Sequence, residues 1–219
     1  TVEVEVDIAT GLPAFSTVGL PEGAVKESKD RVKAAIKNCG YEFPSRRITV
    51  NLAPADIRKE GAAFDLPIAV GILSAMDVVK KEKLEEFFIL GELSLYGKVK
   101  PIRGTLPISV AARDSGLRGV IIPEENAKEA AVVKGIEVLA VKNLFEVVDF
   151  LEGNREIQPT MVDLEEIFSE ELSYPVDFNE VKGQEHVKRC LEVAAAGGHN
   201  VIMIGPPGSG KTMMARRVT

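Results

Sequence analysis

The octet Gly205-Pro206-Pro207-Gly208-Ser209-Gly210-Lys211-Thr212 has the residue types and spacing most suited to chemistry in this chain. It matches G-x-x-x-x-G-K-[ST], in which glycines let backbone N–H groups curl around a phosphate. Lys211 would place a cation on the β- and γ-phosphates, and the Thr212 hydroxyl would bind Mg²⁺. The octet therefore predicts a site for ATP and Mg²⁺.

The residues on either side of the octet support this interpretation. The run Asn200–Ile204 predicts a buried strand, and the residues from about Lys211 onward favour a helix. A strand before the loop and a helix after it are the setting that such a motif needs, because the helix directs free N–H groups at the anion. We therefore prefer a nucleotide-binding loop to an ordinary strand–helix turn.

Hydrolysis of ATP needs more than the loop. An acidic residue on another strand must hold the metal, and a further group must orient the attacking water. The residues 213–219 that follow the motif supply neither. The sequence thus predicts a phosphate loop without a competent ATPase, and no catalytic residue in this stretch.

Composition limits the other possible functions. The chain has 219 residues, with 33 acidic and 27 basic side chains and a net charge of −6, so binding to nucleic acid through bulk positive charge is disfavoured. The longest apolar stretch, 66–76, is too short to cross a bilayer. Two cysteines and two histidines make neither a disulfide framework nor a His-based zinc site. We expect a cytoplasmic protein that has no membrane association.

The elements that would position the loop begin with a mixed α/β domain at 1–152. Alternating residues, Pro and Gly breaks and apolar spacing predict its elements. Residues 14–18 could return beside 2–8, Asp65 is a plausible helix N-cap, and Tyr96-Gly97 is typical of a hairpin. The expected strands are 2–8, 14–18, 47–52, 88–94, 98–102, 119–122 and 137–141, and the expected helices are 21–39, 65–79, 106–115, 124–133 and 144–151.

Two further segments follow the first domain. Residues 153–180 are predicted to form an acidic linker, because 156–181 contain no Lys or Arg. A short helix could lie near 164–172, and a solvated connector is favoured over an acidic interaction motif. Residues 181–219, with a helix at 184–196, would then form the start of a second domain that carries the octet.

Around the octet the chain resembles the AAA+ ATPases, and more narrowly their magnesium-chelatase-like branch. The residues that carry the resemblance are FNEVKGQE at 178–185, AAAGGHN at 194–200 and GPPGSGKT itself. The resemblance implies that Val181 and Gly183 lie beside the adenine of the nucleotide.

The first domain is similar to that of the ComM/YifB family, bacterial competence-related proteins. The shared runs are GLPAF at 11–15, VGLP at 18–21, RITVNLAPAD at 47–56 and FDLPIA at 64–69, and the resemblance covers essentially all 219 residues. It implies a Lon-protease-like domain with a ribosomal-protein-S5-like α/β fold, followed by the start of an AAA+ domain. It also implies a homo-hexameric helicase that promotes branch migration of DNA in natural transformation.

Lon proteases use a Ser–Lys dyad in which the lysine activates the serine. In this chain Ala63 occupies the place of the serine, within 59–66, and Leu106 occupies the place of the lysine, within 101–106. Neither side chain can do this chemistry. We therefore expect the first domain to be a platform without proteolytic activity.

Two other readings remain open beside a DNA motor. One is a chelatase-type ATPase that assists metal insertion or protein remodelling, for which we expect a resemblance in the second domain only. The other is an ATP-dependent protease, which the missing dyad disfavours. For DNA contact, Lys98, Lys100 and Arg103 form a possible patch beside the hairpin, although solvated surface charge is the simpler explanation. Tyr96 is the only aromatic residue nearby, so base stacking has little support from the sequence.

Overall fold

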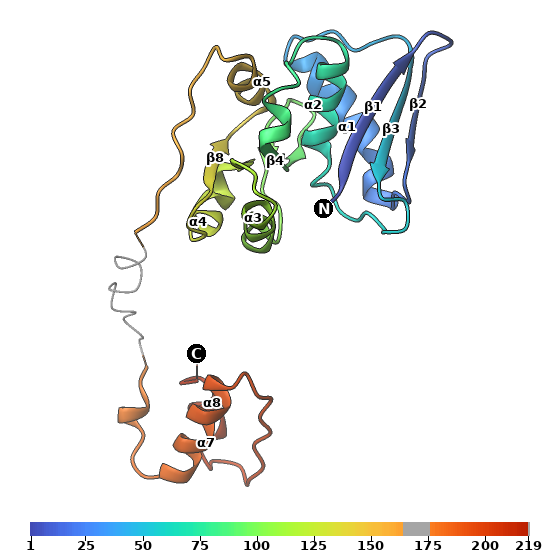
Figure 1. The fold of residues 1–219 in the computed structure, drawn as a ribbon. Coiled ribbons are helices and arrows are strands. Elements are labelled where there is room, and N and C mark those ends of the chain that lie inside the picture. Colours follow the sequence, from blue (N-terminus) through green and yellow to red (C-terminus); the bar gives the residue numbers. More distant parts are fainter. Residues whose placement is uncertain (164–175, 219) are drawn as a thin grey trace. The chain divides into compact units, whose positions relative to one another are not determined.

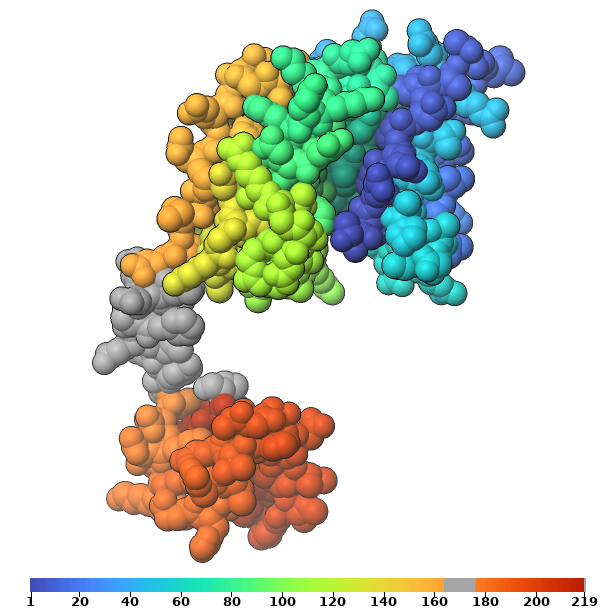
Figure 2. Space-filling view, viewed as in Figure 1, coloured from blue at the N-terminus to red at the C-terminus, as the bar shows by residue number. Residues whose placement is uncertain are grey.

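The computed structural model describes residues 1–163 and 176–218, which belong to two compact units, Thr1–Leu164 and Glu165–Thr219 (Figure 1). The helix predicted near 164–172 lies outside the described residues. No helix among the described residues is long and apolar enough to cross a membrane. Figure 2 shows the packed surface of each unit, with the first in blue to gold and the second in orange to red.

The first sheet of unit 1 has the order β1-β3-β2, built from β1 (Glu3–Ala9), β3 (Arg47–Ala53) and β2 (Ala14–Val18). β3 pairs antiparallel with β1 and parallel with β2. The prediction that 14–18 lies beside 2–8 is therefore wrong, because β3 lies between them (Figure 1). Ile48, Val50 and Leu52 of β3 are at most 1% exposed, so the most apolar strand takes the central position.

Two helices cover the inner face of this sheet. α1 (Gly23–Asn38) buries one apolar stripe, and α2 (Asp65–Ala75) is buried over most of its surface (Figure 1). α2 ends at Ala75, short of the predicted end at Val79, and Asp77 then adopts a left-handed backbone with φ +59°. The two helices form the central layer of unit 1.

The second sheet is fully parallel and has the order β4-β7-β8. Its strands are β4 (Phe87–Ile89), β7 (Gly119–Pro123) and β8 (Glu137–Val141). Every residue of β7 is buried, as expected for a parallel strand covered on both faces. Val120 and Ile122 pack with residues of α3 (Thr105–Asp114) and α4 (Ala127–Ala130), whereas Ile121 joins the larger core that includes α5 (Leu144–Glu152).

Two predicted elements of this region divide in the structure. The helix expected at 124–133 is a 3₁₀ turn at Glu124–Asn126 followed by the four-residue α4. In that turn the Asn126 amide hydrogen-bonds both backbone groups of Ile102, each at 2.9 Å. The strand expected at 88–94 divides because Gly91 leaves the sheet, donating its N–H to Ala63 O and accepting from the N–H of Leu66, both at 3.0 Å.

Beyond this break the predicted hairpin is confirmed. β5 (Glu92–Leu93) pairs antiparallel with β6 (Val99–Lys100), and Tyr96-Gly97 lie in the turn between them. After α5 the chain stays against unit 1: Ile157 packs on the core, and the Thr160 N–H donates to Val138 O at 2.8 Å. The early part of the predicted linker therefore packs on the first unit.

Unit 2 contains α7 (Glu185–Ala196) and α8 (Lys211–Ala215), with a 3₁₀ turn at Phe178–Glu180. The strand predicted at 200–204 is wrong for the described residues, because none of them pairs with it to form a ladder. Ile202 and Ile204 are accordingly 84% and 90% exposed.

Candidate functional site

The backbone of the octet has the curvature that a phosphate loop needs. Gly208 and Gly210 have φ of +81° and +84°, a left-handed conformation that side chains with a Cβ rarely adopt. α8 begins at Lys211, directly after Gly210. Glycine at these positions is therefore explained by the loop conformation itself.

The Lys211 ammonium lies across this loop. It donates hydrogen bonds to Gly205 O and Pro206 O, each at 2.8 Å, and to Ser209 Oγ at 3.2 Å. An ammonium group has three N–H donors, so all of them have partners within the octet. The positive charge of Lys211 is thus held at the loop. There a phosphate oxygen of a bound nucleotide can replace one of the backbone carbonyl oxygens as the hydrogen-bond acceptor.

Thr212 is exposed, one residue into α8, so its hydroxyl is accessible to a ligand. Within 1–163 and 176–218, no cluster of three or more His, Cys, Asp or Glu side chains could hold a metal. A nucleotide-bound Mg²⁺ fits this arrangement, because Mg²⁺ keeps several waters and takes few protein ligands. Phosphate oxygens and Thr212 would supply the rest.

Val181 packs against α8, the helix that follows the loop. It is 3% exposed and packs with Leu191 of α7 and Met214 of α8. Gly183, with φ +74°, follows on the surface. The structure therefore connects Val181 to the loop through Met214. A Cβ added at Gly183 would meet no atom within 4 Å, so no octet side chain packs on that side of Gly183 in the described part of the chain.

Arg217 is a site residue that sequence reasoning missed. Its guanidinium donates to Asp177 O at 2.9 Å, to the Glu180 carboxylate at 2.5 Å and to Met213 O at 3.1 Å. It thereby fixes the segment before Val181 to α8. No local pattern could have indicated this, because its partners Asp177 and Glu180 lie about 40 residues earlier.

A cavity of 430 Å³ lies beside the loop. Its wall includes Ser209 and Lys211 of the octet and the apolar run 201–204. Gln184, His186 and Cys190 of the α7 region also line it, whereas Val181 and Gly183 do not. His186 is exposed and forms part of this wall.

The three cations proposed for DNA belong to unit 1. Lys98 follows the hairpin turn, Lys100 lies in β6, and Arg103 comes shortly after; all three are exposed. None of them forms an ion pair with any residue in the described part of the chain. Their charges are therefore available to an external anion.

The positions aligned with the Lon dyad hold no reactive group. Ala63 lies in a turn two residues before the start of α2, and Leu106 is 39% exposed in α3. Lys59, close to Ala63 in sequence, is 1% exposed and donates its ammonium hydrogen bond to Pro54 O. The Lys59 side chain therefore links two ends of the loop 54–59 by a hydrogen bond.

Asp65 has a different role from the predicted N-cap. It is the first residue of α2, and its fully buried carboxylate accepts hydrogen bonds from Arg31 Nε at 2.6 Å, Arg31 Nη2 at 3.0 Å and Leu93 N at 3.2 Å. Burial raises the pKa of Asp65, and the bonds from Arg31 and Leu93 oppose that rise. Asp65 thereby connects α1, α2 and β5.

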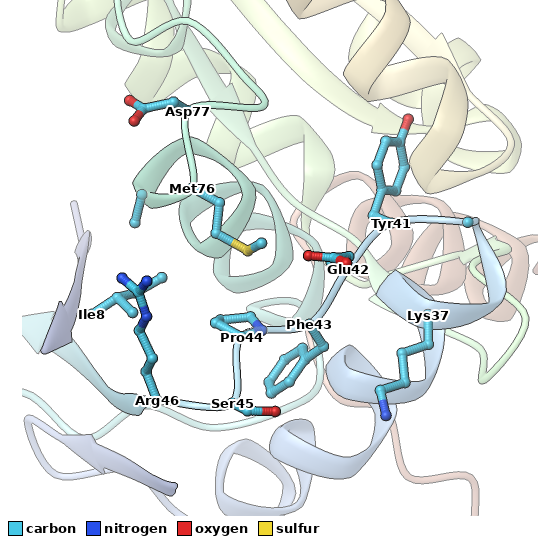
Figure 3. Close-up of a pocket in the computed structure, with 12 residues that line it drawn as sticks. Ile8, Lys37, Tyr41, Glu42, Phe43, Pro44, Ser45, Arg46, Met76 and Asp77 are labelled. Atoms are coloured by element: carbon cyan, nitrogen blue, oxygen red, sulfur yellow. The ribbon is translucent and has the colours of Figure 1, made fainter. Parts of the chain in front are cut away.

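A second cavity, of 760 Å³, lies in unit 1 where α1 and α2 end (Figure 3). Figure 3 shows Glu42 and Arg46 extending into this space, whereas the Tyr41 ring points away from it. Burial, followed by the charges of Asp149 and Glu152, raises the pKa of Tyr41 to about 12. None of the predicted site residues lines this cavity.

Comparison with known families relates both units to magnesium chelatase. A family model described as subunit ChlI of Mg-chelatase matches residues 4–126, and one described as magnesium chelatase, subunit ChlI, matches residues 177–219. The expectation that a chelatase resemblance would be confined to the second domain is therefore wrong, because the first match lies wholly in unit 1.

Individual relatives cover the whole chain. It is 43% identical over 219 residues to competence protein ComM of Haemophilus influenzae and 44% identical over 218 residues to the YifB protein of Escherichia coli. It spans 43% and 42% of the lengths of these proteins. Lon protease 2 of Bacillus subtilis is 36% identical over 149 residues, which are 64% of this chain and 26% of that protein. The mixed α/β chain with a Lon-like first unit therefore belongs to the ComM/YifB family of magnesium-chelatase-like proteins.

Proposed function

We propose that this chain is part of an ATP-driven AAA+ motor that acts on DNA. The observation that carries the proposal is the phosphate loop: two left-handed glycines shape it, and the Lys211 ammonium is held across it by three hydrogen bonds. The name of the ComM relative, a competence protein, supports a role with DNA. Assembly as a homo-hexamer belongs to the same proposal.

In this proposal the residues of the octet bind and orient the nucleotide. The backbone of Gly205–Gly210 and the Lys211 ammonium bind its phosphates, Thr212 contributes a hydroxyl to Mg²⁺, and Val181 with Gly183 flanks the adenine. Hydrolysis of ATP would supply the free energy for movement along DNA. Unit 1 serves as a platform that does not cleave peptides, because Ala63 and Leu106 have no nucleophile or base.

Nucleotide binding is tested by titrating the chain with a fluorescent ATP analogue in Mg²⁺. Lys211→Ala should weaken binding by about 10-fold to 100-fold, because a hydrogen bond to a charged group contributes about 1.5–3 kcal/mol. Arg189→Ala is the matched control: it also removes one positive charge from unit 2, from a side chain 76% exposed and paired with Glu192. Equal affinity of Lys211→Ala and the wild type would contradict the proposal.

The action on DNA requires the full-length protein. Given forked or four-way DNA and ATP, the wild type should separate strands and its Lys211→Ala variant should not. If the wild type shows no ATP-dependent unwinding, the proposal that the protein is a DNA motor is wrong.

A chelatase-type ATPase is the second candidate, and the two magnesium chelatase family matches favour it. The same full-length preparation, given a metal-free tetrapyrrole, Mg²⁺ and ATP, would distinguish the candidates. Stimulated metal insertion without unwinding of DNA would favour the chelatase, and the reverse result would favour the motor.

A further inference from the structure

The β5–β6 turn, the end of α1 and the start of α5 meet at one place, which we call the hairpin junction. It carries three large exposed apolar side chains: Leu95 is 52% exposed, Tyr96 83% and Phe145 50%. Single exposed apolar residues are ordinary on a protein surface, whereas several gathered at one place indicate a binding surface.

Hydrogen bonds attach these residues to one frame. Asn38 Nδ2, at the end of α1, donates to Leu95 O at 2.7 Å, and Leu144 N donates to Gly97 O at 2.8 Å. Burial raises the pKa of the Cys39 thiol and the nearby backbone of Phe145 opposes that rise, so the start of α5 lies beside the end of α1. Tyr96 and Phe145 are distant in sequence, yet their neighbours Gly97 and Leu144 share a backbone hydrogen bond. The sequence showed Tyr96 as the only nearby aromatic, and the fold adds a second.

The frame is stiff. Gly97 has φ +77°, and a Cβ there would lie 2.3 Å from Cys39 Sγ, so the turn packs directly against the end of α1. Gly97 N donates to Ser94 O, and Ser94 N donates to Lys98 O, each at 2.9 Å. Side chains on such a support lose little backbone freedom when they bind a partner, which favours affinity.

Unpaired positive charge adjoins the exposed apolar residues. Lys98 and Lys100 flank the buried Val99, so they lie on the outward side of β6, and neither has an ion-pair partner in residues 1–163 or 176–218. On α5, the Glu146 carboxylate is engaged by the Lys142 N–H at 2.8 Å and by Arg155 at 3.4 Å. Glu92, the cross-strand neighbour of Lys100, makes no ion pair with it.

We propose that the hairpin junction binds single-stranded DNA, with bases stacked on Tyr96 and Phe145 and phosphates paired with Lys98 and Lys100. This rests on the proposed function and assigns it a contact surface in unit 1. Exposed aromatics beside unpaired cations are the combination found in proteins that bind single strands, and stacking accepts any base. A protein partner is less favoured, because lysine is depleted at protein interfaces.

The test uses the full-length protein and a fluorescein-labelled oligothymidylate, followed by anisotropy over a range of salt concentrations. Tyr96→Ala and Phe145→Ala should each weaken binding by about tenfold without changing the salt dependence, as expected for loss of stacking. Tyr96→Phe should keep the wild-type affinity. The double variant Lys98→Ala, Lys100→Ala should reduce the slope of log K against log salt by about 1.4, since each phosphate contact to a single strand contributes about 0.7.

Leu12→Ala is the matched control, because Leu12 is 88% exposed in the β1–β2 loop, outside the junction. Circular dichroism would confirm that every variant is folded. Wild-type affinity in the double variant Tyr96→Ala, Phe145→Ala overturns the junction as a DNA surface, and unwinding that persists in the same variant leaves the proposed function standing. Loss of self-association in that variant with unchanged DNA affinity also overturns it, in favour of a protein interface. A wild type that neither binds the oligonucleotide nor unwinds DNA overturns both proposals.

Discussion

At the scale of single residues, we expect the buried ion pair between Arg31 and Asp65 to affect the stability of the fold strongly. Its carboxylate is fully buried, and the arginine side chain is 22% exposed. Arg31 also donates to Ala24 O at 2.8 Å. Removing one partner of a buried pair costs much more than the pair contributes, because it leaves the other charge uncompensated.

We therefore expect Asp65→Ala to lower the free energy of unfolding by about 3–5 kcal/mol. Asp114→Ala should lower it by less than about 1 kcal/mol, because that carboxylate is 62% exposed in its pair with Arg113. Urea unfolding followed by circular dichroism measures both. Similar losses in the two variants would show that the buried pair does not hold the helices together.

Residue roles that depend on neighbours in sequence could be predicted, and those that depend on distant partners could not. The spacing of Gly208, Gly210 and Lys211 is local, and the structure shows the loop conformation that it implies. Asp65 looked like an N-cap because capping rules consider only the next few residues, whereas Arg31 lies 34 positions away. The burial of Lys59 likewise could not be predicted, because no local pattern of residues indicates it.

At the scale of elements, the hairpin turn offers a clean test of close packing. Gly97→Ala should lower the free energy of unfolding by about 1–2 kcal/mol for the left-handed backbone, and by about 1–3 kcal/mol more for the clash with Cys39. Gly135→Ala is the control, since it has φ +84° but its nearest neighbour for a Cβ, Arg113, is 4.0 Å away. Thermal unfolding of both variants separates the backbone cost from the clash.

Elements of unit 1 could be placed from the alternation of apolar residues, but their pairing could not. The periodicity of 47–52 identifies a strand without saying which neighbours it takes, and the structure gives it two. The run 200–204 has the composition of a buried strand, yet among the described residues no strand lies beside it to supply a ladder. Composition thus indicates what an element prefers, and pairing depends on which other strands are present.

At the scale of the whole molecule, the apolar clusters separate by unit. Two clusters of buried apolar residues draw only on unit 1, and the third, formed by Val181, Leu191 and Met214, draws only on unit 2. We therefore expect residues 1–163, produced alone, to unfold at the same urea concentration as unit 1 within the complete chain. A midpoint lower by more than about 1 M would show that unit 2 stabilises unit 1, since a typical slope is about 1–3 kcal/mol per M.

The central place of β3 has a consequence for synthesis of the chain. β1 and β2 are made first, but each of them pairs only with β3, whose first residue, Arg47, comes 29 positions after the end of β2 at Val18. At about 5–20 residues per second, the ribosome leaves both strands without a partner for roughly 1.5–6 seconds. During that interval the apolar side of β1 is accessible to chaperones and to other nascent chains, and α1, the crossover between β2 and β3, has time to form before the sheet closes.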